Sequence, residues 1–253
     1  MVAQHALPHG PNCPRRGRCG YHSTIGDVES TRMSSTVLRL YSDFVCPFCF
    51  IAEHSTLPRL REEFDLAVEW CGFELHPGTP RGGMPLSALF PPARLPAVRA
   101  HMQQFAARFG VTGMNHPDHI PNTRRALAIA ELARDQSRLD PFRESAMVGY
   151  WCEGLDLEKN DDLRVIAERA GLEGGDALSA ADDPAFHVRV GERQADARRH
   201  GVTGIPTFFI GSEAVVGCHP YDVLATAARR AGARPRLRSV AQDSDDAGAD
   251  HGR

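Results

Sequence analysis

The sequence has no apolar run long enough to cross a membrane and no strong excess of charge. A transmembrane helix needs about 20 consecutive apolar residues, and no segment approaches that length. The formal net charge of the 253 residues is -3, which gives no reason to expect a nucleic-acid partner. Seven cysteines are too few for a disulfide scaffold of this length, and their number is odd. We therefore expect a globular protein without a membrane span, large enough to bury a sizeable core.

The two ends of the chain lack the periodic apolar pattern of the middle. Residues 1–33 are rich in Pro, Gly, His and Arg, and they contain no continuous apolar core of a signal peptide. After Pro235 the chain is polar and acidic. We predict that both ends are disordered, with the natural start at Met33 or a dispensable extension before it. Cys13 and Cys19 are interpreted as incidental, with metal binding as the alternative.

The most informative stretch is a Cys-Pro-Phe-Cys motif that follows a predicted strand. The apolar run 37–41 is typical of a buried strand, and the motif then opens a segment with helical spacing. Pro47 suits the first helical position, which places Cys46 at the helix N-terminus. The helix dipole and the unpaired N–H groups there favour a thiolate. We predict that an exposed Cys46 attacks, with a pKa below the free value of about 8.5, and that the more buried Cys49 resolves the mixed disulfide.

Two other interpretations of the motif stay open at this point. Half of a zinc site would need a second pair of ligands, and no closely spaced pair follows the motif. The two cysteines would otherwise be purely structural. The position of the motif between a strand and a helix favours a redox pair over both, and we predict no metal and no cofactor.

The rest of the pattern predicts a second strand, a helical block and a final hairpin. Asn122, Asp161 and Asp162 are predicted to cap helices, and Asp183-Pro184 to begin one. The predicted helices are 47–64, 95–109, 123–134, 142–151, 163–170, 185–200 and 220–231, and the predicted strands are 37–41, 66–75, 207–210 and 214–217. The hundred residues after the second strand carry almost no strand signal. Their pattern indicates a helical segment inserted between the two halves of another fold.

This layout resembles the α/β thioredoxin fold with an inserted helical domain, as in the DsbA family. The resemblance covers about residues 36–233, and the stretch 70–77 is similar to the cytoplasmic FrnE-like members. It rests on Phe44-Val45-Cys46-Pro47-Phe48-Cys49, on Gly201-Val202-Thr203-Gly204-Ile205-Pro206-Thr207-Phe208, and on Pro121-Asn122-Thr123 followed by Ala126-Leu127. The implied division is a disordered extension over 1–33, a first thioredoxin part over 34–84, a helical insertion over 85–185, a second thioredoxin part over 186–234 and a disordered acidic tail over 235–253.

The resemblance also implies how a substrate is held. The Ile205–Pro206 peptide bond is expected to be cis and to lie against the motif, which leaves the backbone of Ile205 free to pair with a substrate. The predicted site therefore has Cys46 and Cys49 as catalytic residues, with Pro206, Ile205 and Phe48 as substrate-binding residues.

One departure from the family pattern concerns proton transfer. Thioredoxin and DsbA resemble each other in an acidic residue six positions before the first cysteine, and here that position is Leu40. Asp43, Glu74 or water remain as substitutes. Phe48 between the cysteines offers neither a charge nor a hydrogen bond to the thiolate, so we expect a less oxidising couple than in DsbA.

The predicted activity is thiol–disulfide exchange on protein or small-molecule disulfides or thiols. We expect a cytoplasmic enzyme, because the cytosolic thiol pool is reducing, acting as a monomer or as a homodimer. A first alternative is an enzyme resembling kappa-class glutathione transferases or 2-hydroxychromene-2-carboxylate isomerases, which use a serine near the place of Cys46. A second is a non-catalytic binding or chaperone module. Neither alternative needs a second cysteine.

Overall fold

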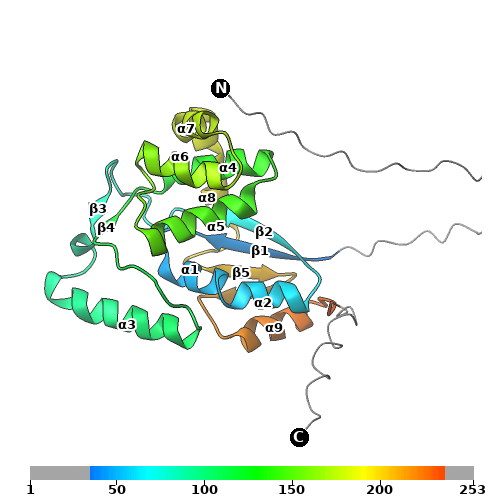
Figure 1. The fold of residues 1–253 in the computed structure, drawn as a ribbon. Coiled ribbons are helices and arrows are strands. Elements are labelled where there is room, and N and C mark those ends of the chain that lie inside the picture. The colour runs from blue at the N-terminus through cyan, green and yellow to red at the C-terminus, as the bar shows by residue number, and fades with distance from the viewer. Residues whose placement is uncertain (1–34, 237–253) are drawn as a thin grey trace, which may run out of the picture. The chain divides into compact units, whose positions relative to one another are not determined.

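The computed structural model describes residues 35–236 (Figure 1). The predictions for residues 1–34 and 237–253, including those for Cys13 and Cys19, lie outside the described residues. The strands are β1 (Thr36–Ser42), β2 (Leu66–Gly72), β3 (Met84–Pro85), β4 (His119–Ile120), β5 (Thr207–Ile210) and β6 (Glu213–Val216). The helices are α1 (Pro47–Glu53), α2 (Thr56–Glu63), η1 (Leu86–Ala88), η2 (Pro92–Arg94), α3 (Leu95–Arg108), α4 (Arg124–Asp135), α5 (Leu139–Val148), η3 (Gly149–Glu153), α6 (Asn160–Arg169), α7 (Gly174–Asp182), α8 (Pro184–Arg199) and α9 (Tyr221–Arg230).

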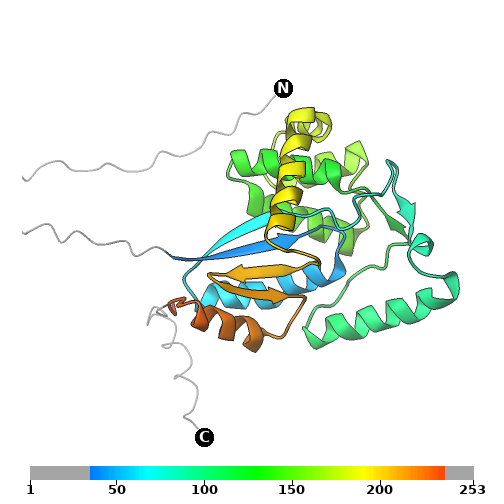
Figure 2. The same ribbon diagram turned by 180° about the vertical axis from the view of Figure 1, so that it is seen from behind.

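Four strands form the main sheet in the order β2-β1-β5-β6. The β1–β2 pair is parallel, and β5 and β6 run antiparallel to their neighbours. Leu40 pairs with Trp70 on one side and Phe208 on the other, and all three side chains are buried in the core. Figures 1 and 2 show α1, α2 and α9 on one face of this sheet and α8 over the other. The position where the family pattern has an acid is therefore an apolar core position here.

The predicted helix over 47–64 is two helices, with a break at His54 and Ser55. Pro58 has no N–H to bond the His54 carbonyl, and in a continuous helix its ring would clash with that carbonyl. Ser55 leaves helical geometry, at φ -131° and ψ -72°, and its hydroxyl donates to the Ile51 carbonyl at 2.5 Å. Helix α1 consequently ends just after Glu53.

The inserted segment consists of a packed cluster and an arm. Helices α4, α5, α6 and α7 pack on one another, whereas α3 buries only Ala106 among its 14 residues. Figure 1 shows α3 set apart from the α4–α7 cluster. The spacing predicted α3 correctly but missed the two-residue strands β3 and β4. It also missed α7, because that helix begins with Gly174-Gly175 and buries alanines rather than large apolar residues.

Two of the predicted helix starts are confirmed. Asn122 Oδ1 accepts from the Arg124 N–H at 2.9 Å, and Asp183 Oδ1 accepts from the Ala185 N–H at 2.8 Å. Asp161 and Asp162 do not cap α6, which was wrongly predicted, since the helix already begins at Asn160. They lie in its first turn, where their negative charges interact favourably with the positive end of the helix dipole.

The last described residues are hydrogen-bonded to the short connection between α2 and β2. The Asp65 N–H donates to the Arg234 carbonyl at 2.8 Å, and the Arg236 N–H donates to the Glu63 carbonyl at the same distance. Residues up to 236 are thus hydrogen-bonded to the segment before β2. In the part of the chain that the structure describes, every helix is too short or too polar to traverse a bilayer.

Candidate functional site

Cys46 begins helix α1 and closes its first turn. It is the N-cap residue, Pro47 follows as the first helical residue, and Cys46 Sγ accepts a hydrogen bond from the Cys49 N–H at 3.4 Å. The sulfur thus lies beside the N–H groups and the positive end of the helix dipole. The predicted exposure is wrong, because Cys46 is only 2% exposed and lines a cleft.

Cys49 lies one turn further into the protein and is fully buried, as predicted. Burial raises the pKa of its thiol well above the ordinary value, and Cys46 and the charge of Glu53 raise it further, against the backbone N–H of Asp43, which lowers it. The two sulfurs therefore have different surroundings. Cys46 faces a cleft at a helix terminus, whereas Cys49 is enclosed and kept as a thiol.

Glu53, which was not predicted as a site residue, is a buried carboxylate one turn after Cys49. Its side chain is 2% exposed, and Arg143 Nη2 lies 3.1 Å from Oε2. Ser42 Oγ and Trp70 Nε1 both donate to Oε1. Residues four apart share a helix face, so the spacing from Cys49 was visible in the sequence. What no local pattern shows is that three distant side chains would enclose this carboxylate.

The two acids considered as substitutes for the missing strand carboxylate have other partners. Asp43 Oδ2 accepts from the Leu75 N–H at 2.8 Å and from the Thr123 hydroxyl at 3.2 Å. Burial outweighs both donors and raises the pKa of Asp43 to about 7. Glu74 Oε2 accepts from Arg124 Nη1 at 2.6 Å. The carboxylate that influences the buried motif cysteine through its charge is the one on α1.

The loop before β5 lies against Cys46. The Cys46 thiol donates to the Ile205 carbonyl at 3.7 Å, and the Ile205–Pro206 peptide bond is cis. The Gly217 N–H donates to the Pro206 carbonyl at 2.7 Å, which ties this loop to the residues after β6. Cys218 comes next, and burial, with a smaller effect from Cys46, raises its pKa to about 12. Cys218 was not predicted as a site residue, although the register of the β5–β6 hairpin places it near Pro206.

An apolar cleft of about 340 Å³ opens over the motif, between the start of α1 and the α3 arm. Phe48, a predicted substrate-binding residue, lies in its wall and packs edge-on against Phe105 of α3, with ring centroids 5.2 Å apart. The apolar side of α3 thus faces the motif. Residues that line the cleft include Cys46, Phe48, Val98, Met102, Trp151 and Ile205.

The remaining described cysteines have thiols with raised pKa values. Burial raises the pKa of Cys71 to about 11 and also raises that of Cys152. Within residues 35–236, no group of three or more His, Cys, Asp or Glu side chains is arranged to hold a metal ion. Cys46 and Cys49 therefore remain the candidate thiols.

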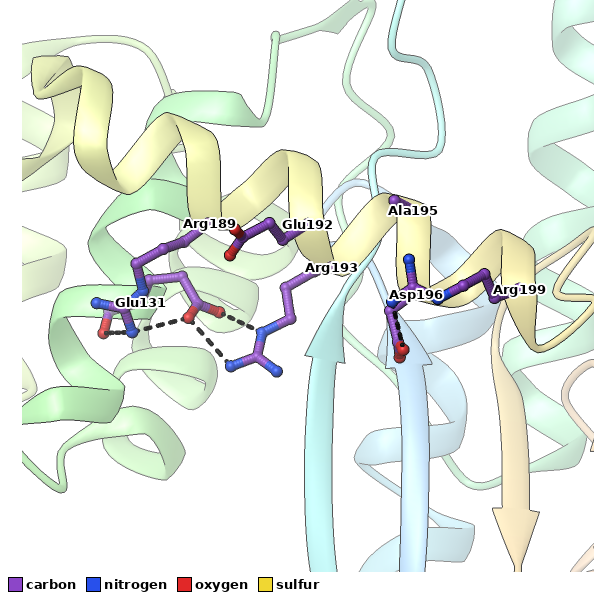
Figure 3. A pocket seen from close by; sticks show the side chains of 7 residues that line it. All are labelled: Glu131, Arg189, Glu192, Arg193, Ala195, Asp196 and Arg199. Atoms are coloured by element: carbon purple, nitrogen blue, oxygen red, sulfur yellow. Dashed lines mark hydrogen bonds and ion pairs between the residues drawn. The ribbon is translucent and has the colours of Figure 1, made fainter.

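A second hollow lies between α4 and α8 and is lined by charged side chains (Figure 3). Glu131, which is buried, accepts from Arg189 Nη2 at 2.9 Å and from Arg193 Nε at 3.2 Å. These arginines already have a carboxylate partner, and none of the residues lining this hollow lines the cleft over Cys46. We interpret it as a structural ion-pair cluster between two helices.

The fold and the motif define a thioredoxin-like domain with an inserted helical segment, which confirms the predicted fold class. The sequence model of the DSBA-like thioredoxin domain family matches residues 37–229. The chain therefore belongs to this family, as the resemblance implied.

Individual relatives are distant. The chain is 27% identical over 198 residues to the uncharacterized protein YwbO of Bacillus subtilis, covering 75% of this chain and 94% of that protein. It is 24% identical over 186 residues to a 2-hydroxychromene-2-carboxylate isomerase of Sphingobium xenophagum, covering 73% and 93%. Among solved structures, a probable DsbA oxidoreductase from Streptomyces coelicolor superposes with a TM-score of 0.69 at 23% identity, covering 81% of this chain and 94% of that one.

Proposed function

We propose that the protein is a thiol–disulfide oxidoreductase that uses Cys46 and Cys49. The Cys46 thiolate attacks one sulfur of a substrate disulfide, forms a mixed disulfide and releases the other sulfur as a thiolate. Cys49, after losing its proton, attacks the Cys46 sulfur and releases the second substrate thiolate. The substrate disulfide is thereby reduced by two electrons and the dithiol is oxidised; substrate oxidation is the same sequence in reverse.

The observation that carries the proposal is the asymmetry of the two sulfurs. Cys46 accepts the Cys49 N–H at a helix N-terminus and faces the cleft, whereas Cys49 is fully buried behind it. A nucleophile needs access and a stabilised thiolate, and a resolving thiol needs only to reach the nucleophile's sulfur. The adjacent Ile205 and Pro206 would hold the substrate chain beside the mixed disulfide.

Single cysteine variants test the assignment. Reduced protein is mixed with a small aromatic disulfide, quenched with acid and analysed by mass spectrometry of the intact chain. We expect Cys49→Ser to accumulate a mixed disulfide and Cys46→Ser to form none, while Cys152→Ser, a control thiol outside the cleft, behaves like wild type. A Cys46→Ser variant with full exchange activity would refute the proposal.

The isomerase relative supports one rival, a glutathione-dependent isomerase of the 2-hydroxychromene-2-carboxylate type. Such an enzyme has no use for a resolving thiol, so Cys49→Ser would leave its turnover intact. Turnover of a chromene carboxylate that requires glutathione and survives Cys49→Ser would favour the rival.

We also propose that the protein works in the cytoplasm. We further propose that the Cys46–Cys49 dithiol/disulfide couple is less oxidising than one in which the two residues between the cysteines stabilise the thiolate. Phe48 lies in the apolar wall and packs on Phe105, where it can add neither charge nor hydrogen bond to Cys46. Equilibration in glutathione buffers should give a potential below the ~-120 mV of a strongly oxidising dithiol. A value at or above that level would contradict this part.

A further inference from the structure

The cleft over Cys46 suits a small molecule better than the face of a folded protein. Cys46 is 2% exposed, and the cleft it lines lies under the α3 arm, with Phe48 and Met102 in its walls. A sulfur in such a position is reached by a molecule that enters the cleft. A volume of about 340 Å³ is at the lower end of the range for sites that enclose small organic ligands.

Two polar side chains in this apolar lining each carry a nitrogen without a hydrogen-bond partner among the described residues. Arg99 and His116 line the cleft, and Arg99 Nε and His116 Nε2 are buried without a hydrogen-bond partner among residues 35–236. Arg99 is otherwise anchored, since its Nη2 donates to Asp118. A buried donor left unpaired costs free energy, which a matching acceptor on a ligand would recover.

The charges of Arg99 and His116 indicate which ligand group they would bind. Arg99 is always cationic, and both burial and the neighbouring Arg99 lower the pKa of His116, which keeps the ring neutral and able to donate through one nitrogen. An anionic oxygen is the complementary partner for a guanidinium N–H beside a neutral N–H. The rest of the wall offers apolar surface.

We propose that the cleft binds a small organic anion with an apolar, ring-sized body, whose carboxylate is held by Arg99 and His116 and whose thiol or disulfide sulfur reacts with Cys46. This substrate class rests on the proposed exchange reaction. Arg99 and His116 are binding residues in it, and the sulfur chemistry stays with the two motif cysteines.

Binding is tested without reaction in the Cys46→Ser protein. The probes are 1-naphthoate and the uncharged 1-naphthalenemethanol, titrated by calorimetry. We expect naphthoate to bind more tightly than the alcohol. Adding Arg99→Gln should weaken naphthoate about tenfold, or ~1.4 kcal/mol, and leave the alcohol unchanged. Arg108→Gln, an exposed arginine on the same helix outside the cleft, is the matched control and should change neither.

Reaction is tested with two aromatic disulfides on the fully reduced chain. These are 5,5′-dithiobis(2-nitrobenzoate), which carries carboxylates, and 4,4′-dithiodipyridine, which is uncharged at neutral pH. Rates that depend on Cys46 are divided by the rates with a free thiol. We expect Arg99→Gln to slow the carboxylate probe about tenfold and to spare the pyridine probe. Arg99→Lys, which keeps the charge but loses Nε, should fall between wild type and Arg99→Gln, and it covers the case that Arg99→Gln fails to fold.

The outcomes separate this inference from the proposed function. Equal binding of the two naphthalene probes, no binding of either, or an Arg99→Gln effect that the pyridine probe shares would overturn the inference. A site that accepts only a peptide with an apolar and an acidic side chain would also overturn it. Arg99-dependent naphthoate binding in a chain whose wild type performs no disulfide exchange would uphold the anion site and refute the oxidoreductase.

Discussion

Asp43 is a buried acid directly before the turn that leads into the motif. Its carboxylate bonds the Leu75 N–H and the Thr123 hydroxyl, so it ties β1 to the chain after β2 and to the start of α4. Burial nevertheless raises its pKa to about 7 from an ordinary 3.8. The folded protein therefore holds a proton at Asp43 over a pH range in which the unfolded chain has lost it.

This difference predicts a pH-dependent stability. The stability that the protonated Asp43 carboxyl adds to the folded protein is fully present below pH ~4 and is lost as the pH rises through about 7. The loss in the free energy of unfolding is up to about 4 kcal/mol, because the pKa values of Asp43 in the unfolded and folded states differ by about three units. Asp43→Asn cannot ionise, so its stability relative to wild type should rise between pH 4 and pH 8. Urea unfolding at several pH values measures this, with the exposed Asp161→Asn as control. A relative stability that stays constant with pH would contradict the prediction.

Glu53 acts on Cys49 through its charge. Because that charge raises the pKa of Cys49, Glu53→Gln should shift the pH midpoint of the resolving step downward. Release of the second thionitrobenzoate from a Cys46 mixed disulfide, followed against pH, reports that step. The variant should also lose about 3 kcal/mol of stability, since among residues 35–236 Arg143 then keeps Asp140 alone as an ion-pair partner. An unchanged or higher midpoint would show that Glu53 does not act by charge in this way.

Among the helices and strands, short sequence patterns predicted those elements whose ends are fixed by neighbouring residues. The strand before the motif, the helix start at Pro47 and the hairpin after Pro206 were each marked by proline, turn residues and apolar runs. Pro58 carried an equally local signal for the break between α1 and α2, and the prediction overlooked it. Helix α7 could not be found in this way, because its buried residues are small.

One buried acid, Glu131, forms ion pairs across the contact between α4 and α8, beside the Arg189–Asp135 pair. Although burial alone would raise the pKa of Glu131, Arg193, Arg134 and Arg189 together hold it below the ordinary value. Glu131→Gln should therefore leave three arginines without the carboxylate that they share. We expect the free energy of unfolding to fall by about 2 kcal/mol, which is less than for a fully buried ion pair because the arginines are partly exposed to solvent. This corresponds to a fall in Tm of about 5 °C.

The matched control for this change is Glu192→Gln. Glu192 lines the same hollow (Figure 3), but within residues 35–236 it forms no ion pair with Arg189 or Arg193. Scanning calorimetry of the two variants beside wild type gives the comparison. Equal Tm values for both variants would mean that the Glu131 cluster does not hold the helices together.

At the scale of the whole molecule, the candidate site is assembled from segments far apart in the chain. Cys46 comes from the first part of the sheet domain, Ile205 from the second, and Arg99 and His116 from the inserted segment. The motif and its loop were predictable because family-like sequence patterns mark both. The arm residues were not, since their place depends on how α3 folds back over the motif. The division into parts over 34–84, 85–185 and 186–234 stays a prediction.

Residues 35–236 should be sufficient for both the fold and the candidate site. We expect the fragment 35–236 to match the full chain in Tm and in Cys46 reactivity, because the sheet, its helices and the cleft are all built from these residues. The predicted boundary was Pro235, but Arg236 donates its backbone N–H to the Glu63 carbonyl and its Nε–H to the Phe64 carbonyl. A fragment 35–235 should therefore lose about 1 kcal/mol relative to 35–236, as expected for backbone partners left unpaired at a partly exposed edge. Thermal unfolding of the two fragments and the full chain decides this, and a large loss of Tm in 35–236 itself would show that the ends contribute to folding.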